Sequence, residues 1–259
     1  MSKFKLTIEY EGTRYKGWQI QKEVKTIQGS FFVAVEEAFN TQKFEFYGAG
    51  RTDAGVHATA QVAHLEVSTQ MACDKIRYRL NDLLPYDINV KEVVAVPLKF
   101  HARHDAVYRS YVYIISKERT AFGKNLVWWV KDQLDFNKMK ETIKLYEGFK
   151  DFSSFADTSS GESESTKVEL KWARIYETAD YYAIHILGSH FLWKMVRRMV
   201  GVLVEAGRGK LSYNEIESFF KAPSTKPAHY TAPPSGLYLE RVYYKGESVS
   251  EEFYAYVSL

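Results

Sequence analysis

The sequence predicts an α+β protein in which two successive halves share one order of elements: strand, helix, strand, strand, helix, strand. In short runs, apolar residues alternate with polar ones, which indicates half-buried strands. Between these runs, apolar residues recur every three or four positions, which indicates amphipathic helices. The order βαββαβ is that of the ferredoxin-like fold. We therefore expect two ferredoxin-like halves whose sheets join into one extended, mostly antiparallel sheet with a central active-site cleft.

The first half, residues 1–104, contains six predicted elements. Strands are predicted at 4–10, 44–47, 61–67 and 88–96, and helices at 26–40 and 74–84. Apolar and polar residues alternate from Phe4 to Tyr10, as a strand with one buried face requires. The second helix ends before Pro85, because proline lacks the N–H that continues a helix.

The second half, residues 105–259, is predicted to repeat this order. Strands are predicted at 107–115, 168–176, 181–187 and 237–244, and helices at 136–147 and 191–206. Asp135 is the expected N-cap of the first of these helices, and Ser212 with Glu215 forms a capping box for a short extra helix. The serine-rich stretch 151–166 is expected to be a mobile surface loop. The halves share no residue-level identity, so the repeat is one of order only.

Composition limits the class of protein. With 46% hydrophobic and 26% charged residues, the chain is typical of soluble globular proteins. A net charge of +3 is too small to indicate a nucleic-acid partner by itself, although 15% aromatic residues offer stacking surfaces for bases. A single cysteine excludes an intrachain disulfide and a multi-cysteine zinc site. The chain starts without a signal-peptide pattern and has no apolar run of membrane-spanning length, so we expect a cytoplasmic protein.

The most informative stretch is residues 48–57, GAGRTDAGVH. Small residues surround one arginine, Arg51, and one carboxylate, Asp53, between two predicted strands. Glycine lets the backbone turn tightly and approach a ligand closely. An acid in such a loop is presented to a partner, since an unpaired carboxylate in a core is very costly. The alternative interpretation is an ordinary glycine-rich turn in which aspartate is a turn residue.

Two further stretches carry candidate site residues. The predicted helix at 191–206 places Lys194, Arg197, Arg198 and Gly201 on one face, opposite an apolar face. A solvated basic face is the simplest interpretation, and we favour it for Lys194. In the predicted strand at 107–115, Tyr111 lies on the same side as Arg109 and Tyr113. Core packing is the default explanation for a tyrosine in a strand.

Residues 50–58, GRTDAGVHA, resemble the catalytic loop of the TruA-type tRNA pseudouridine synthases. Further stretches between about residues 3 and 243 resemble the same family. They are 15–21 with 26–28, the Arg-x-Tyr-x-Tyr pattern at 109–113, the run 195–197 leading to Gly201, and APPSGLYL at 232–239. The resemblance implies an isomerase that converts uridine to pseudouridine at positions 38, 39 and 40 of the tRNA anticodon stem-loop. It also implies a homodimer.

The resemblance implies a role for each matching residue. Asp53 is the expected catalytic residue, and Arg197 is expected to contact it. An arginine within a few Å keeps a carboxylate ionised even in a dry pocket. Tyr111 is expected to stack on the target base and Leu237 to line the pocket against it. Arg51 is expected to fill or stabilise the space that the flipped base vacates.

The chain departs from the family pattern at two positions. His104 stands where the family commonly has an aromatic residue after Phe-His-Ala-Arg, and Lys167 stands where an arginine is usual. Neither is among the proposed catalytic residues. The isomerisation needs no redox change and no phosphate energy, so we expect no cofactor and no metal. Three routes stay open for Asp53: attack at C1′, addition to the uracil ring, or removal of a sugar proton.

Two other classes of function are less favoured. Ferredoxin-like sheets with exposed aromatics also describe RNA-binding modules without catalysis, but the characteristic RNP string is absent from this sequence. An aspartic hydrolase needs two Asp-Thr-Gly-like loops that share a proton. The only second candidate, at residues 157–161, has the wrong spacing.

Overall fold

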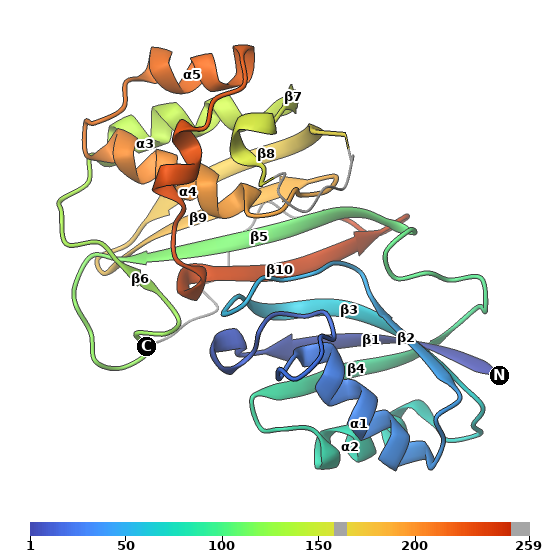
Figure 1. The fold of residues 1–259 in the computed structure, drawn as a ribbon. Helices are drawn as coiled ribbons and strands as arrows, with labels where there is room; N and C mark the ends of the chain where they lie inside the picture. Colours follow the sequence, from blue (N-terminus) through green and yellow to red (C-terminus); the bar gives the residue numbers. More distant parts are fainter. Residues whose placement is uncertain (158–164, 250–259) are drawn as a thin grey trace. The chain divides into compact units, whose positions relative to one another are not determined.

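The computed structural model describes residues 1–157 and 165–249, which belong to two compact units (Figure 1). The first unit contains Met1–Val107 together with the segment that begins at Tyr238, and the second contains Tyr108–Leu237. The predicted boundary instead lies after residue 104, with the last strand in the second half. The difference arises because this strand, β10 (Leu237–Tyr244), pairs in parallel with a strand of the first unit.

The sheet of the first unit is built on β1. Its strands are β1 (Ser2–Tyr10), β2 (Phe44–Gly48), β3 (His57–Val67), β4 (Ile88–Val96) and β10. The order is β4-β1-β3-β10, and β2 also pairs with β3; only the pairing of β10 with β3 is parallel. Tyr10 at the end of β1 lies opposite both Ala58 of β3 and Ile88 of β4. The segments that follow β1 and precede β3 and β4 therefore meet at one end of the sheet.

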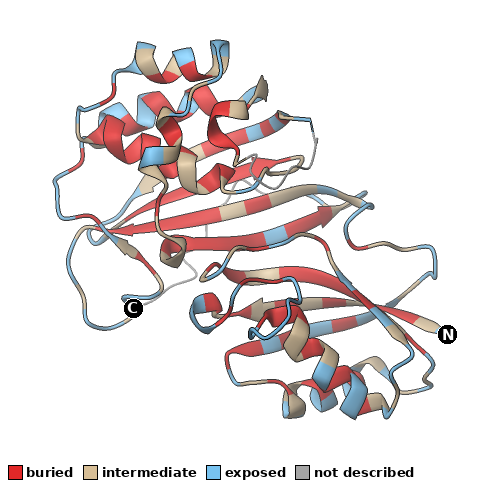
Figure 2. Ribbon diagram, in the orientation of Figure 1, coloured by how far each residue is buried: buried red, intermediate tan, exposed pale blue. Residues whose placement is uncertain are grey.

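Two helices, α1 (Ile27–Phe39) and α2 (Cys73–Leu83), lie on the same side of this sheet (Figure 1). The buried residues of α1 include Ile27, Phe31 and Val35, and those of α2 are Ile76 and Leu80 (Figure 2). The Thr26 side chain caps α1 by accepting from the Gly29 N–H, as expected for an N-cap threonine. The Arg79 guanidinium donates to the Ala38 carbonyl at 2.7 Å and ties α2 to α1.

The sheet of the second unit has the order β5-β9-β8-β7, in which neighbouring strands are antiparallel. These strands are β5 (Ala106–Ser116), β7 (Gly148–Asp151), β8 (Lys167–Glu177) and β9 (Tyr181–Gly188). A two-residue strand, β6 (Trp128–Trp129), pairs in parallel with β5. Neither β6 nor β7 was predicted, because both are too short to show a periodic pattern.

The helices of the second unit are α3 (Phe136–Thr142), α4 (Met195–Gly207) and α5 (Tyr213–Lys221). The Asp135 and Ser212 side chains cap α3 and α5 as predicted. Short 3-10 segments complete the unit at η2 (Ile143–Tyr146), η3 (Ser153–Phe155), η4 (Lys226–Tyr230) and η5 (Pro234–Gly236). In the first unit, η1 (Gly12–Arg14) follows β1.

The predicted mobile loop at 151–166 is wrong for its first residues. Asp151 ends β7, η3 follows, and the side chains of Phe152 and Phe155 are fully buried. They belong to an aromatic cluster with Tyr146, Phe219 and Phe220, where ring centroids lie 5.1–6.2 Å apart. These two core residues were not predicted, because the serines between them give the segment the composition of a surface loop. Residues 158–164 of this prediction lie outside the described residues.

The predicted start of α4 at residue 191 is wrong by four residues. Lys194 has φ +60°, a left-handed conformation, so the helix begins at Met195. The predicted exposed face is also incorrect at Gly201, which is buried. A Cβ atom there would lie 1.5 Å from the Tyr230 carbonyl oxygen, so only glycine lets η4 pack this closely against α4.

These units confirm the α+β class and the mostly antiparallel sheets. The joining of the two sheets around a central cleft stays a prediction. In the described part of the chain, no helix has the length and apolar character needed to span a membrane.

Candidate active site

The loop that carries Asp53 connects β2 to β3 in the first unit. Within it, the Val56 N–H donates to the Asp53 carbonyl at 3.1 Å, which closes a β-turn. Gly55 is the third residue of this turn and has φ +77°, a conformation that favours glycine there. Asp53 is half-buried, and Arg51 is exposed two residues earlier. Asp53 therefore occupies the first position of a tight turn and is partly accessible to solvent.

Hydrogen bonds from the segment after β1 fix this loop. The Trp18 N–H donates to the Thr52 carbonyl at 3.0 Å, and the Gly55 N–H donates to the Tyr15 carbonyl at 3.3 Å. The hydroxyls of Thr52 and Tyr10 lie 2.8 Å apart and share a buried hydrogen bond. Backbone groups on both sides of Asp53 are thus tied to residues 10–18, which holds the turn in one conformation.

The ends of the loop are fixed by side chains of β3. Gln61 Nε2 donates to the Gly50 carbonyl at 3.0 Å, and Gln61 is fully buried. His57 is also buried, and its Nδ1 accepts from the Gly12 N–H at 3.0 Å. Because Nδ1 accepts, the neutral His57 ring carries its proton on Nε2. Gln61 and Tyr10 were not predicted as site residues, since each fits an ordinary strand pattern.

The phenol of Tyr15 anchors the segment after β1 to the turn that precedes β4. Its hydroxyl donates to the buried carboxylate of Asp87, which precedes β4. Burial raises the pKa of the Tyr15 phenol, and the hydrogen bond to the Asp87 carboxylate raises it further. The phenol therefore remains a donor at physiological pH, so β4, the η1 segment and the Asp53 loop form one connected structure.

In the second unit, Arg197 lies in the first turn of α4 and is anchored to the segment before β10. Its Nε donates to the Ala232 carbonyl at 2.7 Å, and the Ala232 N–H donates back to the Arg197 carbonyl at 3.0 Å. This reciprocal pair of hydrogen bonds fixes the Nε end of the guanidinium group. Arg197 is thus neither a core residue nor part of a freely solvated face.

The same segment is anchored to β5 by Tyr113. The Tyr113 hydroxyl donates to the Pro233 carbonyl at 2.8 Å. Burial raises the pKa of this phenol, while the positive charge of Arg197 opposes the shift. Leu237 follows and is buried, with 5% of its surface exposed. Tyr111, two residues before Tyr113, packs edge-on against Phe191 with the ring centroids 4.8 Å apart.

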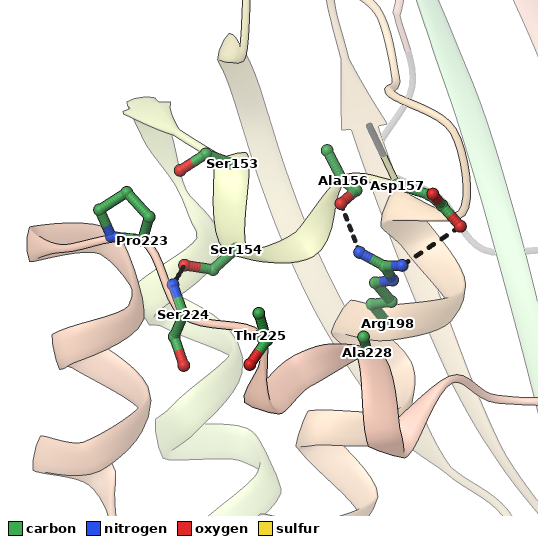
Figure 3. A pocket seen from close by; sticks show the side chains of 9 residues that line it. All are labelled: Ser153, Ser154, Ala156, Asp157, Arg198, Pro223, Ser224, Thr225 and Ala228. Carbon is green, nitrogen blue, oxygen red and sulfur yellow. Dashed lines mark hydrogen bonds and ion pairs between the residues drawn. The ribbon is translucent and has the colours of Figure 1, made fainter. Parts of the chain in front are cut away.

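A pocket of about 390 Å³ lies beside the start of α4 (Figure 3). It is lined by Ser153, Ser154, Ala156, Asp157, Arg198, Pro223, Ser224, Thr225 and Ala228. The Arg198 guanidinium donates to the Ala156 carbonyl and lies 3.4 Å from the Asp157 carboxylate, which also accepts from Lys194 at 2.8 Å. Burial lowers the pKa of Arg198, and Asp157 opposes the shift. Both cations at the start of α4 bind Asp157. The prediction that Lys194 belongs to a solvated basic face is therefore wrong.

The structure thus brings the predicted residues together in two groups. Asp53 and Arg51 share one braced loop of the first unit. In the second unit, Arg197 binds the segment 232–237 that ends at Leu237, and Tyr111 lies on β5, whose Tyr113 binds the same segment. Within residues 1–157 and 165–249, no group of His, Cys, Asp or Glu side chains is placed to hold a metal ion.

The comparisons with known proteins decide the family. A family profile described as "tRNA pseudouridine synthase" matches residues 6–105 and 142–245. The chain belongs to the tRNA pseudouridine synthase family. Its members are isomerases that convert uridine to pseudouridine in tRNA. The RNA-binding module without catalysis and the aspartic hydrolase are therefore not favoured.

Similar proteins share almost the full length of the chain. "tRNA pseudouridine synthase A" of Acetivibrio thermocellus is 40% identical over 247 residues, which cover 94% of this chain and all of that protein. "tRNA pseudouridine synthase A" of Ruminiclostridium cellulolyticum is 38% identical, with the same coverage. "tRNA pseudouridine synthase A 2" of Clostridium tetani is 38% identical over 245 residues, which cover 93% of this chain and 98% of that protein. Family membership thus applies to both units.

Proposed function

We propose that this chain isomerises uridine to pseudouridine at positions 38, 39 and 40 of the tRNA anticodon stem-loop, with Asp53 as the catalytic residue. The observation that carries the proposal is the braced turn that presents the Asp53 carboxylate. Backbone hydrogen bonds to Thr52 and Gly55 hold the turn from both sides. A reacting group that is fixed before substrate binds loses less entropy at the moment of reaction.

The reaction breaks the N1–C1′ bond, turns the base, and joins C5 to C1′. The hydrogen on C5 is lost and N1 gains one, so the product is an isomer of the substrate. One ionised carboxylate is enough for each of the three routes open to Asp53. The target base has to leave its stack to reach that carboxylate, which costs a few kcal/mol of unstacking energy.

The second-unit residues complete the proposed site. Arg197 contacts the Asp53 carboxylate, because a guanidinium can hold a carboxylate in one orientation through charged hydrogen bonds. The Tyr111 ring stacks on the flipped uracil, Leu237 packs against it, and Arg51 fills the space that the base leaves. The anchoring of Arg197 and of the segment before Leu237 supports these roles, since both groups are held in place by hydrogen bonds.

The proposed substrate implies the remaining features. A folded stem-loop is recognised chiefly by its shape and backbone, which allows different uridines to be modified in different tRNAs. A homodimer would offer two surfaces to one tRNA, and cytoplasmic location follows from where tRNA is found. Sedimentation of the purified protein tests the homodimer, which predicts twice the chain mass of 30.0 kDa.

Tritium release tests the proposed reaction. A tRNA transcript labelled at uracil C5 should release tritium on incubation with the protein, and the new pseudouridines should map to positions 38–40. The matched control is a transcript with cytidine at these positions and compensating changes on the opposite strand. Equal release from the control would contradict the proposed positions, and no release from either transcript would contradict the reaction.

A further inference from the structure

One end of the first-unit sheet gathers three segments. The Asp53 loop precedes β3, η1 follows β1, and the turn Pro85–Ile88 leads into β4. The register places them together, because Tyr10 pairs with both Ala58 and Ile88. Hydrogen bonds connect them: Gly55 to Tyr15, Tyr15 to Asp87, and the Glu11 N–H to the Asp87 carbonyl at 2.9 Å. The proposed reaction site and this turn therefore share one frame.

An exposed tyrosine stands on this frame. Tyr86 has 81% of its surface exposed, although both of its neighbours in the chain are at least partly buried. The Ile88 N–H donates to the Pro85 carbonyl at 2.9 Å, which closes the turn around Tyr86. The Arg14 guanidinium of η1 lies over the Tyr86 ring, 5.2 Å from its centroid. The ring is thus held by its backbone and by a cation and remains open to solvent.

The charges around this pair favour a polyanion. Lys16 and Lys25 are exposed beside η1, where the Lys16 N–H donates to the Lys25 carbonyl and Lys25 covers the Tyr15 ring. The acids of the same segments are Glu11, whose side chain caps η1, and Asp87, which is buried and accepts from Tyr15. Asp53 is the proposed catalytic group, and Glu23, between Lys16 and Lys25, is exposed and paired with Lys22. An exposed aromatic ring among cations is the arrangement that binds single-stranded nucleic acid, through base stacking and phosphate contacts.

We propose that the Arg14–Tyr86 pair is a binding site for one unpaired nucleotide of the substrate RNA, next to the uridine that reaches Asp53. The base stacks on the exposed Tyr86 ring, and the Arg14 guanidinium contacts the adjoining phosphate. The site rests on the proposed function, since it is placed by its connection to the Asp53 loop. It adds a contact that holds the RNA beside the reacting nucleotide.

Titration of a labelled anticodon stem-loop RNA with the full-length protein tests the site. Tyr86→Ala should raise the Kd about 5- to 150-fold, the range expected for loss of one stacked base. Tyr86→Phe keeps the ring and should stay within about twofold of the parent. Arg14→Gln should reduce the slope of log Kd against log salt by about 0.7–0.9, the value for one phosphate contact.

Tyr78→Ala is the matched control. Tyr78 is 59% exposed on α2 and also has a guanidinium, that of Arg77, over its ring at 4.4 Å. It lies within α2 and not in the segments that adjoin the Asp53 loop, so its loss should leave the Kd within about twofold of the parent. An equal loss of affinity in Tyr78→Ala and Tyr86→Ala would overturn the proposal, because it would show that exposed aromatic rings contribute to RNA binding without a specific site.

Two further outcomes decide against the proposal. If Tyr86→Ala binds RNA like the parent, no base stacks there. If Tyr86→Ala changes the sedimentation coefficient but not the Kd, the ring contacts a second copy of the chain instead. Turnover by Asp53→Asn separates the two levels of inference: an active Asp53→Asn contradicts the proposed function, whereas an inactive one with unchanged binding by Tyr86→Ala contradicts the stacking site alone.

Discussion

At the scale of single residues, Arg197 shows how one side chain is prepared for a role in the site. Its Nε is used by the Ala232 carbonyl, so the plane of the guanidinium is set by the protein. A planar fork held in this way fits a carboxylate in one orientation, whereas a lysine offers a movable point charge. The role proposed for Arg197 depends on this geometry as well as on charge.

We therefore expect Arg197→Lys to slow pseudouridine formation about tenfold or more, since a hydrogen bond from a charged donor is worth about 1.5–3 kcal/mol. Single-turnover kinetics at saturating tRNA measure the effect. Arg174→Lys is the control, because Arg174 of β8 is ion-paired with Glu147 and has no role in the proposed site. A normal rate in Arg197→Lys would remove Arg197 from the reaction.

Another residue-scale feature is the buried imidazole of His64 on β3. Its Nδ1 accepts from the Ala102 N–H at 3.1 Å, and the His101 ring lies 4.7 Å away. Burial lowers the pKa of His64 to about 4, and the neighbouring His101 contributes to the shift. Burial also lowers the pKa of His101, with a contribution from His104. The folded chain therefore keeps His64 neutral, while the unfolded chain protonates it near pH 6.5.

Stability should consequently fall as the pH decreases from about 6.5 to about 4, because the unfolded state binds the additional proton in this window. The free energy lost through His64 is about 3 kcal/mol when the window has been crossed. Urea unfolding at several pH values measures it. His64→Gln should flatten the dependence and exposed His104→Gln should largely preserve it. An unchanged slope in His64→Gln would show that other groups are responsible.

At the scale of elements, α4 is positioned by contacts along its length. The Tyr146 hydroxyl donates to the Met199 carbonyl at 2.8 Å, and Arg198 holds the first turn to the segment after η3. On another side, Gly201 admits the Tyr230 carbonyl. Because Arg197 lies on this helix, a small displacement of α4 would displace the guanidinium as well.

Gly201→Ala should therefore reduce both stability and turnover. Its new Cβ would collide with the Tyr230 carbonyl, and overpacking of this kind costs about 1–3 kcal/mol. Gly50→Ala is the control for the unfolding measurement, because no atom lies within 4 Å of the Cβ position there. An unfolding midpoint for Gly201→Ala equal to that of the parent would show that α4 and η4 separate without cost.

Most elements were predictable because their hydrophobic period is regular. The bounds of β4 and β10 agree with prediction, α1 and α2 differ by one residue at each end, and α5 begins after its predicted N-cap Ser212. The start of α4 was not predictable, since Leu192 and Trp193 continue a helical pattern that the left-handed Lys194 interrupts. The buried Phe152 and Phe155 were missed because serine and aspartate dominate their segment.

At the scale of the whole molecule, the chain order and the spatial units differ. β10 comes from the end of the second unit but pairs with β3, and the Thr59 hydroxyl donates to the Glu240 carbonyl across the same strands at 3.0 Å. Sequence order alone could not predict this, because a strand pattern does not identify its partner. The first unit is therefore completed only when the last strand is in place.

The sequence motifs identified the candidate reactive residues of the site. They did not identify the residues that hold the Asp53 loop in place. Asp53 and Arg197 stand in stretches that the family resemblance identified, whereas Gln61 and Asp87 lie in ordinary patterns. Their importance arises from tertiary hydrogen bonds to the Asp53 loop and its neighbours. Supporting residues of this kind become visible only when segments distant in sequence are brought together.

The most direct test of the account is the turnover of Asp53→Asn on tRNA, measured together with its tRNA affinity and unfolding midpoint. The substitution removes one ionisable group and keeps the size of the side chain. We predict no detectable pseudouridine formation, with a Kd and an unfolding midpoint close to those of the parent, because phosphate contacts elsewhere carry the binding. A rate within about tenfold of the parent, which means a barrier raised by no more than about 1.4 kcal/mol, would contradict a catalytic role for Asp53.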